Sequence, residues 1–347
     1  MPAEPALFTA HPQLAARIPW MPLGQFPTRV HRVEGLVPPS VELWCKRDDE
    51  SGVAYGGNKV RKLEFLLAEA RAQGKKRVCT IGGIGSHHVL ATAIYGRQAG
   101  FEVDAVVFPQ PVTDHVRAQL LADAAVGARL VPTRGYLGVP RAVWRTRGQP
   151  DAAWIAAGGS SVTGTLGYAS GGLELLEQMK RGELPRPDVV YVALGSCGTA
   201  AGLLWSLWHD QAIELRAVRV VDRWVSGARL TRRLAAGVDA LLQVERSGQA
   251  PRLSVEHGFF GGAYGRSTPA ADEAVQASGA VGLRLEPTYT GKCMAALLAD
   301  ARAGRLDGKR VLFLHTYNGV DLQPLIASSP GRDALPPLLQ RHFPVVG

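Results

Sequence analysis

Short apolar segments alternate with longer segments of helical periodicity along most of the chain. Continuous or alternating apolar residues between turn residues are typical of strands, and apolar residues three and four positions apart are typical of helices. We predict strands at 41–46, 77–81, 103–108, 129–131, 154–156, 189–194, 219–221 and 311–315. We predict helices at 58–73, 87–99, 113–125, 167–180, 199–209, 269–278 and 291–303.

This alternation predicts the α/β class with parallel sheets. There are more alternations than one compact sheet needs in 347 residues, so we expect two open, twisted, mostly parallel sheets flanked by helices. We assign residues 1–61 and 173–347 to a large domain, and residues 62–172 to a small domain inserted into it. Ligands of such folds bind at the carboxyl ends of the strands, so we expect the site in the cleft between the two sheets.

The composition is that of a soluble enzyme, with 46% hydrophobic and 20% charged residues. No apolar run has the length of a membrane span, and no basic segment followed by an apolar core opens the chain, so we expect neither a membrane segment nor a signal peptide. Cys45, Cys79, Cys197 and Cys293 are far apart and form no C-x-x-C pair. They indicate the reduced thiols of a cytoplasmic protein and no metal site.

The formal net charge is +9, and basic residues cluster at 141–147 and 229–233. Neither cluster has the interleaved aromatic and glycine residues of an RNA-binding sheet. We therefore expect solvated arginines and no nucleic-acid partner. A positive field of this kind could still attract an anionic cofactor or substrate.

The segment that begins Gly56-Gly57-Asn58-Lys59 places a lysine at the start of a predicted helix. Asn58 is expected to cap this helix, because its side-chain oxygen can accept from a free backbone N–H. A cation in the first turn is opposed by the helix dipole, whereas a neutral amine or an imine suffers less. Lys59 therefore suits a lysine that forms a Schiff base, although a surface lysine in a glycine-rich turn explains the spacing as well.

A second glycine-rich turn carries Ser86, His87 and His88 between a strand and a helix. Ser86 can cap the helix, and the free N–H groups beside it can hold a carboxylate. A simple turn with a cap explains the glycines and the serine but not the paired histidines. Neutral imidazoles that hydrogen-bond a ligand are the interpretation we favour, since protonated histidine is disfavoured at a helix start.

A third turn follows the predicted strand 189–194 and is made of small residues: Gly195, Ser196, Cys197, Gly198 and Thr199. Its backbone N–H groups and hydroxyls can surround a phosphate. The turn matches neither a Walker loop nor G-x-G-x-x-G, so a plain turn stays an alternative.

Further glycine-flanked loops carry polar side chains at Ser161, Tyr264, Tyr289, Thr290 and Thr316. A strand that ends on the hydroxyl of Thr316 can contact a ligand at the sheet edge. Tyr264 and Tyr289 can form aromatic walls or transfer protons, although a single such tyrosine is more often a packed ring with a solvated hydroxyl.

A helix-start lysine, an anion loop, a carboxylate loop and a strand-end hydroxyl are together what a pyridoxal phosphate site requires. At this point a resemblance becomes specific. The chain resembles the family of 1-aminocyclopropane-1-carboxylate (ACC) deaminases and D-cysteine desulfhydrases, which are tryptophan-synthase-β-like, fold type II enzymes. The resemblance runs over nearly the whole chain and includes Lys46-Arg47-Asp48-Asp49, Gly56-Gly57-Asn58-Lys59 and Tyr289-Thr290-Gly291-Lys292.

The resemblance implies that pyridoxal 5'-phosphate lies between the domains and is joined to Lys59. Its cofactor contacts would be Asn58, Lys59, His87, Gly195, Ser196, Cys197, Gly198, Thr199, Tyr289 and Thr316. Thr316 would face the pyridine nitrogen. A neutral hydroxyl there leaves that nitrogen largely unprotonated.

The resemblance also implies the groups that contact an amino-acid substrate. Ser86 would hold the carboxylate, together with His87 and His88, and Ser161 and Thr290 are further candidates for substrate contact. The catalytic residues would be Lys59, Ser86, Tyr264 and Tyr289. Family likeness also implies a homodimer.

The chain departs from the family pattern at three places. His87 stands where relatives have an Asn that meets the phenolic oxygen of the cofactor, and Ser161 stands where they often have Asn. Thr290 and Thr316 replace the Glu and Leu of ACC deaminases and match the hydroxyl residues of desulfhydrase-like members. This last difference argues against opening of a cyclopropane ring.

The sequence therefore predicts a lyase that eliminates sulfide from D-cysteine or a similar β-substituted alanine and gives a keto acid and ammonia. ACC deamination and β-substitution on the same scaffold are alternatives. A third hypothesis is a non-catalytic cofactor carrier, since His87 and Ser161 could mark lost turnover.

Overall fold

The computed structural model describes residues 4–244 and 249–344. Its larger sheet has the order β1-β2-β10-β7-β8-β9, and only β1 runs antiparallel to its neighbour. The strands of this sheet are β1 (Val30–Val33), β2 (Glu42–Lys46), β7 (Val189–Leu194), β8 (Glu214–Arg219), β9 (Leu253–Glu256) and β10 (Arg310–Leu314).

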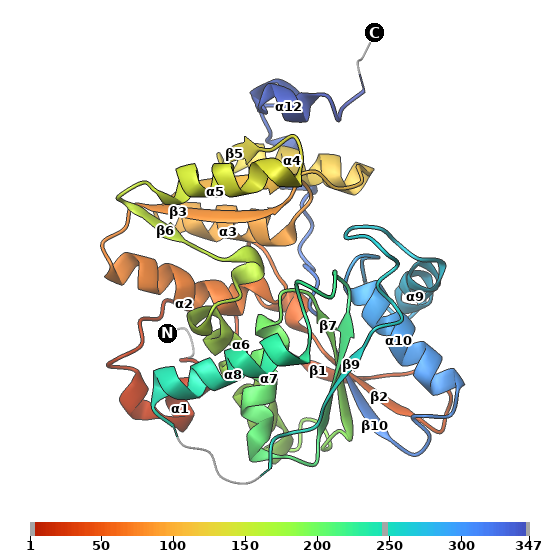
Figure 1. Cartoon of the computed structure of the whole chain (residues 1–347). Coiled ribbons are helices and arrows are strands. Elements are labelled where there is room, and N and C mark those ends of the chain that lie inside the picture. The colour runs from red at the N-terminus through yellow and green to blue at the C-terminus, as the bar shows by residue number, and fades with distance from the viewer. Residues whose placement is uncertain (1–3, 245–248, 345–347) are drawn as a thin grey trace.

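The smaller sheet has the order β5-β4-β3-β6 and is wholly parallel. Its strands are β3 (Arg77–Gly83), β4 (Glu102–Phe108), β5 (Arg129–Pro132) and β6 (Ala152–Trp154). Figure 1 shows this sheet in the upper half of the molecule and the larger sheet in the lower half. The prediction of two mainly parallel sheets flanked by helices is confirmed.

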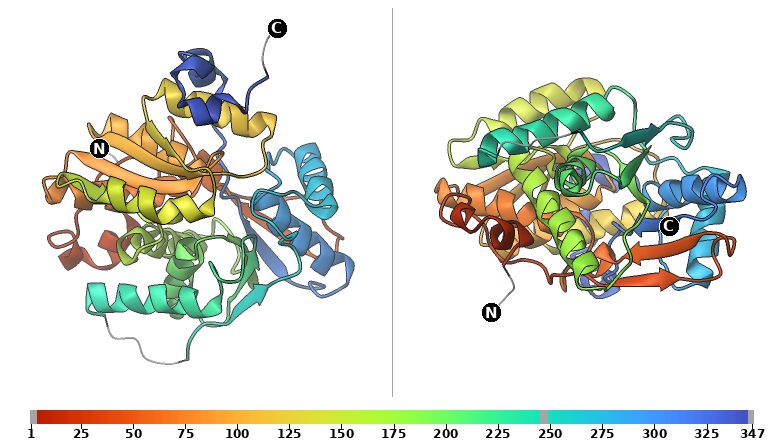
Figure 2. Two further views of the ribbon diagram at one scale, coloured as in Figure 1. Left: turned by 45° about the horizontal axis from the view of Figure 1, so that its top comes forward. Right: turned by 90° about the horizontal axis from the view of Figure 1, so that it is seen from below.

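Helices cover both sheets (Figure 1). They are α1 (Ala6–Ala10), α2 (Lys59–Ala72), α3 (His87–Gln98), α4 (Asp114–Ala125), α5 (Val139–Arg147), α6 (Val162–Lys180), α7 (Gly198–Ser206), α8 (Ala228–Leu242), α9 (Pro269–Ala280), α10 (Thr290–Arg302), α11 (Gln323–Ala327) and α12 (Pro337–Gln340). Helices α9 and α10 lie on one side of the larger sheet, and α6, α7 and α8 lie on the other (Figures 1 and 2).

Helix α2 joins the two halves, because Phe65 packs into the core of α6 and α7 whereas Leu63 and Leu67 pack into the core of the smaller sheet. Helix α6 crosses α2 closely at a glycine. A Cβ atom at Gly167 would lie 2.3 Å from the backbone oxygen of Arg61. This close approach requires the glycine in the interior of α6, which begins at Val162, five residues before our prediction.

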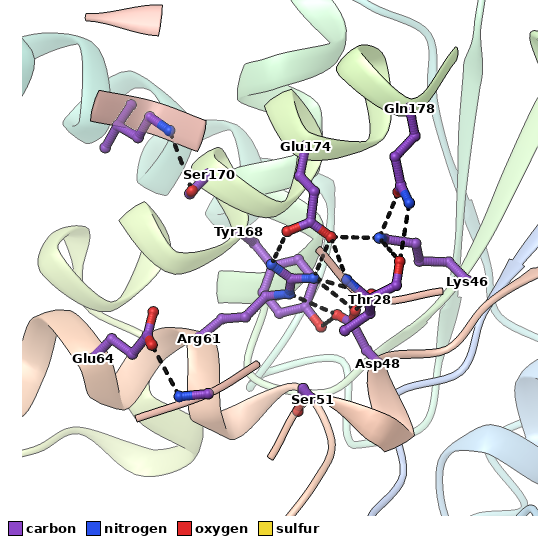
Figure 3. Close-up of polar contacts among 12 residues, drawn as sticks. Thr28, Lys46, Asp48, Ser51, Arg61, Glu64, Tyr168, Ser170, Glu174 and Gln178 are labelled. Carbon is purple, nitrogen blue, oxygen red and sulfur yellow. Dashed lines mark hydrogen bonds and ion pairs between the residues drawn. The ribbon is translucent and has the colours of Figure 1, made fainter. Parts of the chain in front are cut away.

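Four buried charges also fix α2 in place (Figure 3). The Arg61 guanidinium contacts Asp48 at 2.9 Å and Glu174 of α6 at 2.8 Å. Lys46 of β2 pairs with the same Glu174, so two cations meet two anions. Asp48 additionally accepts a hydrogen bond from the hydroxyl of Tyr168. The cluster ties β2, α2 and α6 together immediately behind the predicted lysine.

Most predicted strands and helices are present, but some were misplaced or missed. The predicted strand 219–221 is wrong, because β8 is Glu214–Arg219. Its charged residues obscured it, yet Arg216 is held by Glu214 at 2.9 Å and Asp300 at 2.6 Å. Strands β1 and β9 and helices α1, α5, α8, α11 and α12 had no counterpart in the prediction. The basic clusters at 141–147 and 229–233 place exposed arginines on α5 and α8.

The domain bounds at 61/62 and 172/173 stay a prediction, and both fall inside helices, α2 and α6. The C-terminal segment leaves the larger sheet after β10 and crosses to the smaller one (Figures 1 and 2). There Leu335 and Leu339 pack against Val116 and Leu120 of α4. This end of the chain therefore packs onto the core of the smaller sheet.

Candidate active site

A cavity of about 470 Å³ opens where the carboxyl ends of strands meet the starts of helices. Strands β3, β7 and β10 end at its wall, and helices α2, α3 and α7 begin there. It brings together Asn58, Lys59, Ser86, His87, His88, Gly195, Ser196, Cys197, Gly198, Thr199, Tyr264, Tyr289, Thr290 and Thr316. The cavity thus brings Lys59 together with thirteen other residues that the sequence predicted for the site.

Lys59 is the first residue of α2, and its Nζ atom donates to Asn58 Oδ1 at 2.9 Å. Burial lowers the pKa of Lys59 from 10.5 to about 8, against a weaker attraction by Glu286. The amine is therefore much easier to deprotonate than that of an exposed lysine.

Asn58 does not cap α2, so that part of the prediction is wrong. Its backbone already has helical angles, which turn the side chain away from the helix N–H groups. The amide instead bridges two parts of the site. Its oxygen accepts from Lys59, and its nitrogen donates to the hydroxyl of Thr199 at 3.0 Å. Asn58 thus connects the lysine to the glycine-rich turn of α7.

The turn 195–199 links β7 to α7 and has little room for side chains. Cys197 has a φ of 70°, in the left-handed region that favours glycine. A Cβ atom at Gly198 would lie 2.6 Å from Ser160 Oγ, and one at Gly158 would lie 2.1 Å from Ser196 Oγ. Backbone therefore lines this part of the cavity at the start of a helix, where N–H groups attract an anion.

Two residues beside this turn were missed by the sequence prediction. Ser160 accepts from the Gly198 N–H at 3.1 Å and contacts Ser196 Oγ at 2.8 Å. Lys62 points its Nζ atom at the same turn and donates to the Gly158 carbonyl at 3.1 Å. The spacing could have revealed Lys62, because it lies three residues after Lys59 and so on the same helix face.

Lys62 is a buried cation that has no carboxylate partner among the residues described by the structure. Burial lowers its pKa well below 10.5, and the nearby Lys59 lowers it further. An anion in the turn 195–199 would supply the missing counter-charge and favour the protonated form. A phosphate group is such an anion.

These residues fit pyridoxal phosphate. The backbone cradle and Lys62 suit its phosphate, and the Lys59 amine suits its aldehyde. Tyr289 supplies an aromatic wall, since a Cβ atom at Gly195 would lie 3.0 Å from its ring. Thr316, two residues after the end of β10, lines the cavity, and its carbonyl accepts from the Asn58 N–H at 3.2 Å. When bound, the cofactor would withdraw electrons from the α-carbon of an amino acid.

Ser86 occupies the predicted position at the start of α3, where its hydroxyl accepts from the Val89 N–H at 3.5 Å. A Cβ atom at Gly82 would lie 2.5 Å from Ser86 Oγ, so the strand end must be glycine to admit the serine. The first N–H groups of α3 have no acceptor within the helix. They face the cavity side on which a carboxylate could bind.

His87 is already surrounded by protein groups. Its Nδ1 atom lies 2.8 Å from the Tyr55 hydroxyl and 3.3 Å from the Gln119 amide nitrogen, and its Nε2 atom lies 3.3 Å from Nε2 of His115. Burial, reinforced by His115, lowers the pKa of His87 well below 6.5, so the ring is neutral. A hydrogen bond from His87 to the cofactor would require one of these partners to be exchanged.

His88 packs beneath the same loop, with Nε2 2.8 Å from the hydroxyl of Thr80. Burial lowers the pKa of His88 well below 6.5. Both imidazoles at this helix start are therefore neutral, and their hydrogen bonds to a ligand stay a prediction. His88 lines the cavity, and its contact with Thr80 fixes the ring within the smaller sheet.

Tyr289 donates its hydroxyl hydrogen to the Tyr264 oxygen at 2.9 Å, and the two rings meet edge to face at 6.1 Å. Burial raises the pKa of both hydroxyls, so both are protonated at neutral pH. Glu286, which sequence reasoning missed, fixes this loop by accepting from the N–H groups of Tyr289 and Thr290 at 2.8 Å each. The Thr290 hydroxyl is also engaged by Glu286.

Ser161 is the one predicted site residue that does not line the cavity within the described part of the chain. Its hydroxyl caps α6 by accepting from the Gly164 N–H at 3.1 Å. Its neighbour Ser160 instead contacts the turn 195–199, through Ser196 Oγ and the Gly198 N–H. The sequence prediction named Ser161, which caps the helix, and missed Ser160.

Comparisons with known proteins show the family of this chain. A model of the pyridoxal-phosphate dependent enzyme family matches residues 21–316. The chain is 37% identical to the nocardicin C-9' epimerase of Nocardia uniformis subsp. tsuyamanensis, over 86% of this chain and 92% of that one. It is 32% identical to the D-cysteine desulfhydrase of Salmonella paratyphi A, over 80% and 87%. A crystal structure of an ACC deaminase homologue superposes with a TM-score of 0.77 and 27% identity, over 94% and 100%.

The fold and the site thus define a pyridoxal-phosphate dependent enzyme of fold type II. Within that class, the chain belongs to the family that includes the ACC deaminases and D-cysteine desulfhydrases, as its resemblance implied. In the described residues, no helix is both long and apolar enough to cross a bilayer, and no three metal-binding side chains gather as a metal centre.

We expect Lys62→Met to weaken cofactor binding about 10- to 100-fold, because a hydrogen bond to a charged group contributes about 1.5–3 kcal/mol. The measurement is the dissociation constant from equilibrium dialysis of the apoprotein with pyridoxal phosphate. Lys75→Met is the matched control, since Lys75 also donates to a backbone carbonyl, of Pro150 at 3.0 Å, but at an exposed site. Equal affinity of the two variants would contradict a phosphate contact by Lys62.

Proposed function

We propose that this protein is a lyase that catalyses α,β-elimination and deamination of a small amino acid, as a D-cysteine desulfhydrase does. Its products would be a keto acid, ammonia and sulfide. The observation that carries the proposal is the Lys59 amine, with a pKa lowered to about 8, in one cavity with the Thr316 hydroxyl and the helix start at Ser86.

Lys59 is proposed to remove the proton from the α-carbon. An amine with a pKa of about 8 is available in the neutral form at physiological pH, and a general base is most effective with a pKa near the working pH. Asn58 orients the amine through the 2.9 Å contact between Lys59 Nζ and its Oδ1 atom.

Ser86 and the first N–H groups of α3 are proposed to hold the substrate carboxylate. The substrate would then have its α-carbon between this loop and Lys59. His88, fixed by Thr80, forms the wall below the loop, and His87 closes the side toward α4. This placement orients the carboxylate before the proton is removed.

Tyr264 is proposed to protonate the leaving sulfur. Tyr289 donates to the Tyr264 oxygen, which leaves the Tyr264 O–H free to point at a substrate. Since burial raises the pKa of both hydroxyls, both carry their protons when the leaving group departs. The Tyr289 ring also covers the glycine-rich turn, as its contact with Gly195 indicates.

A product assay tests the proposal. Purified protein is incubated with D-cysteine, L-cysteine, ACC and β-substituted alanines, and sulfide, ammonia and keto acid are measured. We expect sulfide and keto acid in equal amounts from D-cysteine. Keto acid from ACC alone would favour a deaminase, and a new amino acid without keto acid would favour β-substitution. Cofactor absorbance that no amino acid changes would indicate a non-catalytic carrier.

Epimerisation is a second candidate function, favoured by the 37% identity to a nocardicin C-9' epimerase. Epimerisation needs a group that returns the proton on the face opposite the base, and Ser86 and Tyr289 are hydroxyls in the same cavity as Lys59. The test is incubation of single enantiomers in D₂O followed by chiral chromatography. Deuterated substrate of both hands without keto acid would establish epimerisation in place of elimination.

We further propose that the protein is a cytoplasmic homodimer, which family likeness alone supports. Sedimentation equilibrium at several concentrations measures the assembly, and fractionation of the source cells measures the location. A mass of one chain at all concentrations would contradict the dimer.

A further inference from the structure

We infer that the outer half of the cavity is a binding subsite for an aromatic or extended apolar group attached to the β-carbon of the amino-acid substrate. The inference rests on the proposed elimination, because the apolar group would then be part of the leaving group. The substrate class is cysteine carrying an apolar substituent on sulfur.

A continuous series of aromatic rings leads from the glycine-rich turn to the surface. Tyr289, which covers that turn, meets Tyr264 at 6.1 Å between ring centroids. Tyr264 meets Phe108 at 6.5 Å, and Phe108 meets Tyr136 at 5.3 Å. All four residues line the cavity. Aromatic rings at these distances offer a contiguous apolar wall for a ligand ring.

The outer rings come from adjacent strands of the smaller sheet. Phe108 is the last residue of β4, and Tyr136 follows the end of β5, which pairs with β4. The Tyr136 ring packs directly against Phe108, and its hydroxyl also donates to the carbonyl of Pro109 at 3.4 Å. The larger sheet faces them with Val225, in the loop between β8 and α8. The mouth is thus lined by apolar side chains from both sheets.

Large apolar side chains remain exposed at this mouth. Tyr136 is 64% exposed and Val225 is 54% exposed, and both line the cavity. Their chain neighbours Leu137 and Trp224 are 99% and 83% exposed. Apolar surface that gathers at the rim of a cavity is typical of a ligand-binding site. A substrate as small as cysteine would leave these residues without a ligand contact.

The charges of the cavity disfavour an anionic substituent. Among the described lining residues, the lysines Lys59 and Lys62 lie in the cofactor half, and His87 is neutral. Glu286 has its carboxylate occupied by backbone N–H groups of its own loop. Asp222 stands at the exposed rim. An anionic substituent on the substrate would therefore meet no free cation among the described residues that line the outer half of the cavity.

The reaction on this substrate class balances. With water, an S-substituted cysteine would give a thiol, pyruvate and ammonium. Lys59 takes the α-proton, the bond between Cβ and sulfur breaks, and the sulfur leaves with the electron pair and gains a proton. Water supplies the oxygen of the keto acid.

Binding is tested first without elimination, using phenylalanine, alanine and lysine, none of which carries a leaving group. Each enantiomer is titrated into the holoenzyme, and the absorbance change of the bound cofactor gives the dissociation constant. We expect phenylalanine to bind at least about tenfold more tightly than alanine of the same hand. Equal binding of the two, or a preference for lysine through Asp222, would overturn the inference.

Tyr136→Ala tests the subsite itself. Because Tyr136 is 64% exposed, its truncation leaves the buried core unchanged. We expect the advantage of phenylalanine to fall about tenfold, while alanine binding changes less than twofold. Tyr136→Phe is the matched control and keeps the advantage. A Tyr136→Ala protein that binds both amino acids with unchanged ratio would overturn the inference.

Turnover separates this inference from the proposed function. The rates of thiol and keto-acid release are compared for S-benzylcysteine and cysteine of the same hand, and we expect kcat/KM to be at least tenfold higher for S-benzylcysteine. If phenylalanine is preferred but neither cysteine is cleaved, the subsite stands and the elimination fails. If cysteine and S-benzylcysteine are cleaved with equal kcat/KM and phenylalanine has no advantage over alanine, the elimination stands and the subsite fails.

Discussion

The Lys59→Ala protein is expected to lose covalent attachment of the cofactor and at least about 10³-fold in kcat, because one residue supplies both the bond and the general base. In the described cavity, no second amine can replace that of Lys59. The Lys62 amine donates to the Gly158 carbonyl, whereas the Lys59 amine donates to Asn58. The measurements are the visible absorbance of the holoenzyme and single-turnover kinetics with the best substrate of the product assay.

Reduction with borohydride followed by peptide mass spectrometry gives the site of attachment directly. The modified peptide should carry the cofactor on Lys59. Lys292→Met is the control, because Lys292 is another buried lysine that does not itself line the cavity and donates to the Phe260 carbonyl at 2.6 Å. Attachment to Lys62 or Lys292, or full turnover by Lys59→Ala, would remove the basis of the proposed function.

The Arg61→Met protein is expected to lose about 3–5 kcal/mol of the free energy of unfolding, because removal of one partner leaves buried charge without compensation. Asp48 and Glu174 would share only Lys46. The measurement is chemical denaturation of the apoprotein, with the midpoint and the slope fitted together. Arg29→Met is the control, since Arg29 contacts Glu50 at 2.7 Å with half of its side chain exposed, and should cost less than about 1 kcal/mol.

The same cluster predicts the response of stability to acid. Burial opposes ionisation of Asp48, but the charge and hydrogen bonds of Arg61, together with Lys46 and the Tyr168 hydroxyl, outweigh it and lower the pKa of Asp48 from 3.8 to about 2. A carboxyl with a lowered pKa contributes stability that is complete above its unfolded pKa and is lost as the pH falls toward about 2. The wild-type protein should therefore lose stability between about pH 4 and pH 2, and Arg61→Met should lose less over this interval. An Arg61→Met protein as stable as Arg29→Met, or one with an unchanged acid response, would contradict a stabilising cluster.

Lys62 illustrates why part of the site escaped the sequence. Its helical spacing from Lys59 was visible, but a lysine on a helix face is solvated unless something covers it. Only the packing of α6 and the Gly158 loop against α2 removes water from Lys62 and turns it toward the glycine-rich turn. Glu286 is similar, because its role depends on a loop that folds back onto its carboxylate.

Strand β8 and Asn58 show a different error. The prediction followed local residue preferences for strands and helix caps at positions where contacts with distant residues determine the structure. The charged residues of β8 made it an improbable strand until Asp300 of α10 supplied a partner for Arg216. Asn58 satisfies the residue preference of a helix cap, yet Lys59 and Thr199 occupy its polar atoms. In both cases a residue far away in the chain decided the outcome.

The sequence by itself determined the class of fold, the glycine-rich turns and the lysine at the start of α2, because these depend on local periodicity and on backbone conformations that few residues adopt. Tertiary structure alone decided which serine of the pair contacts the glycine-rich turn, that Lys62 points at the loop beside that turn, and that Phe108 and Tyr136 continue the aromatic wall to the surface. These depend on the packing of strands and helices distant in the chain, which sets burial and side-chain direction and is encoded in no single segment.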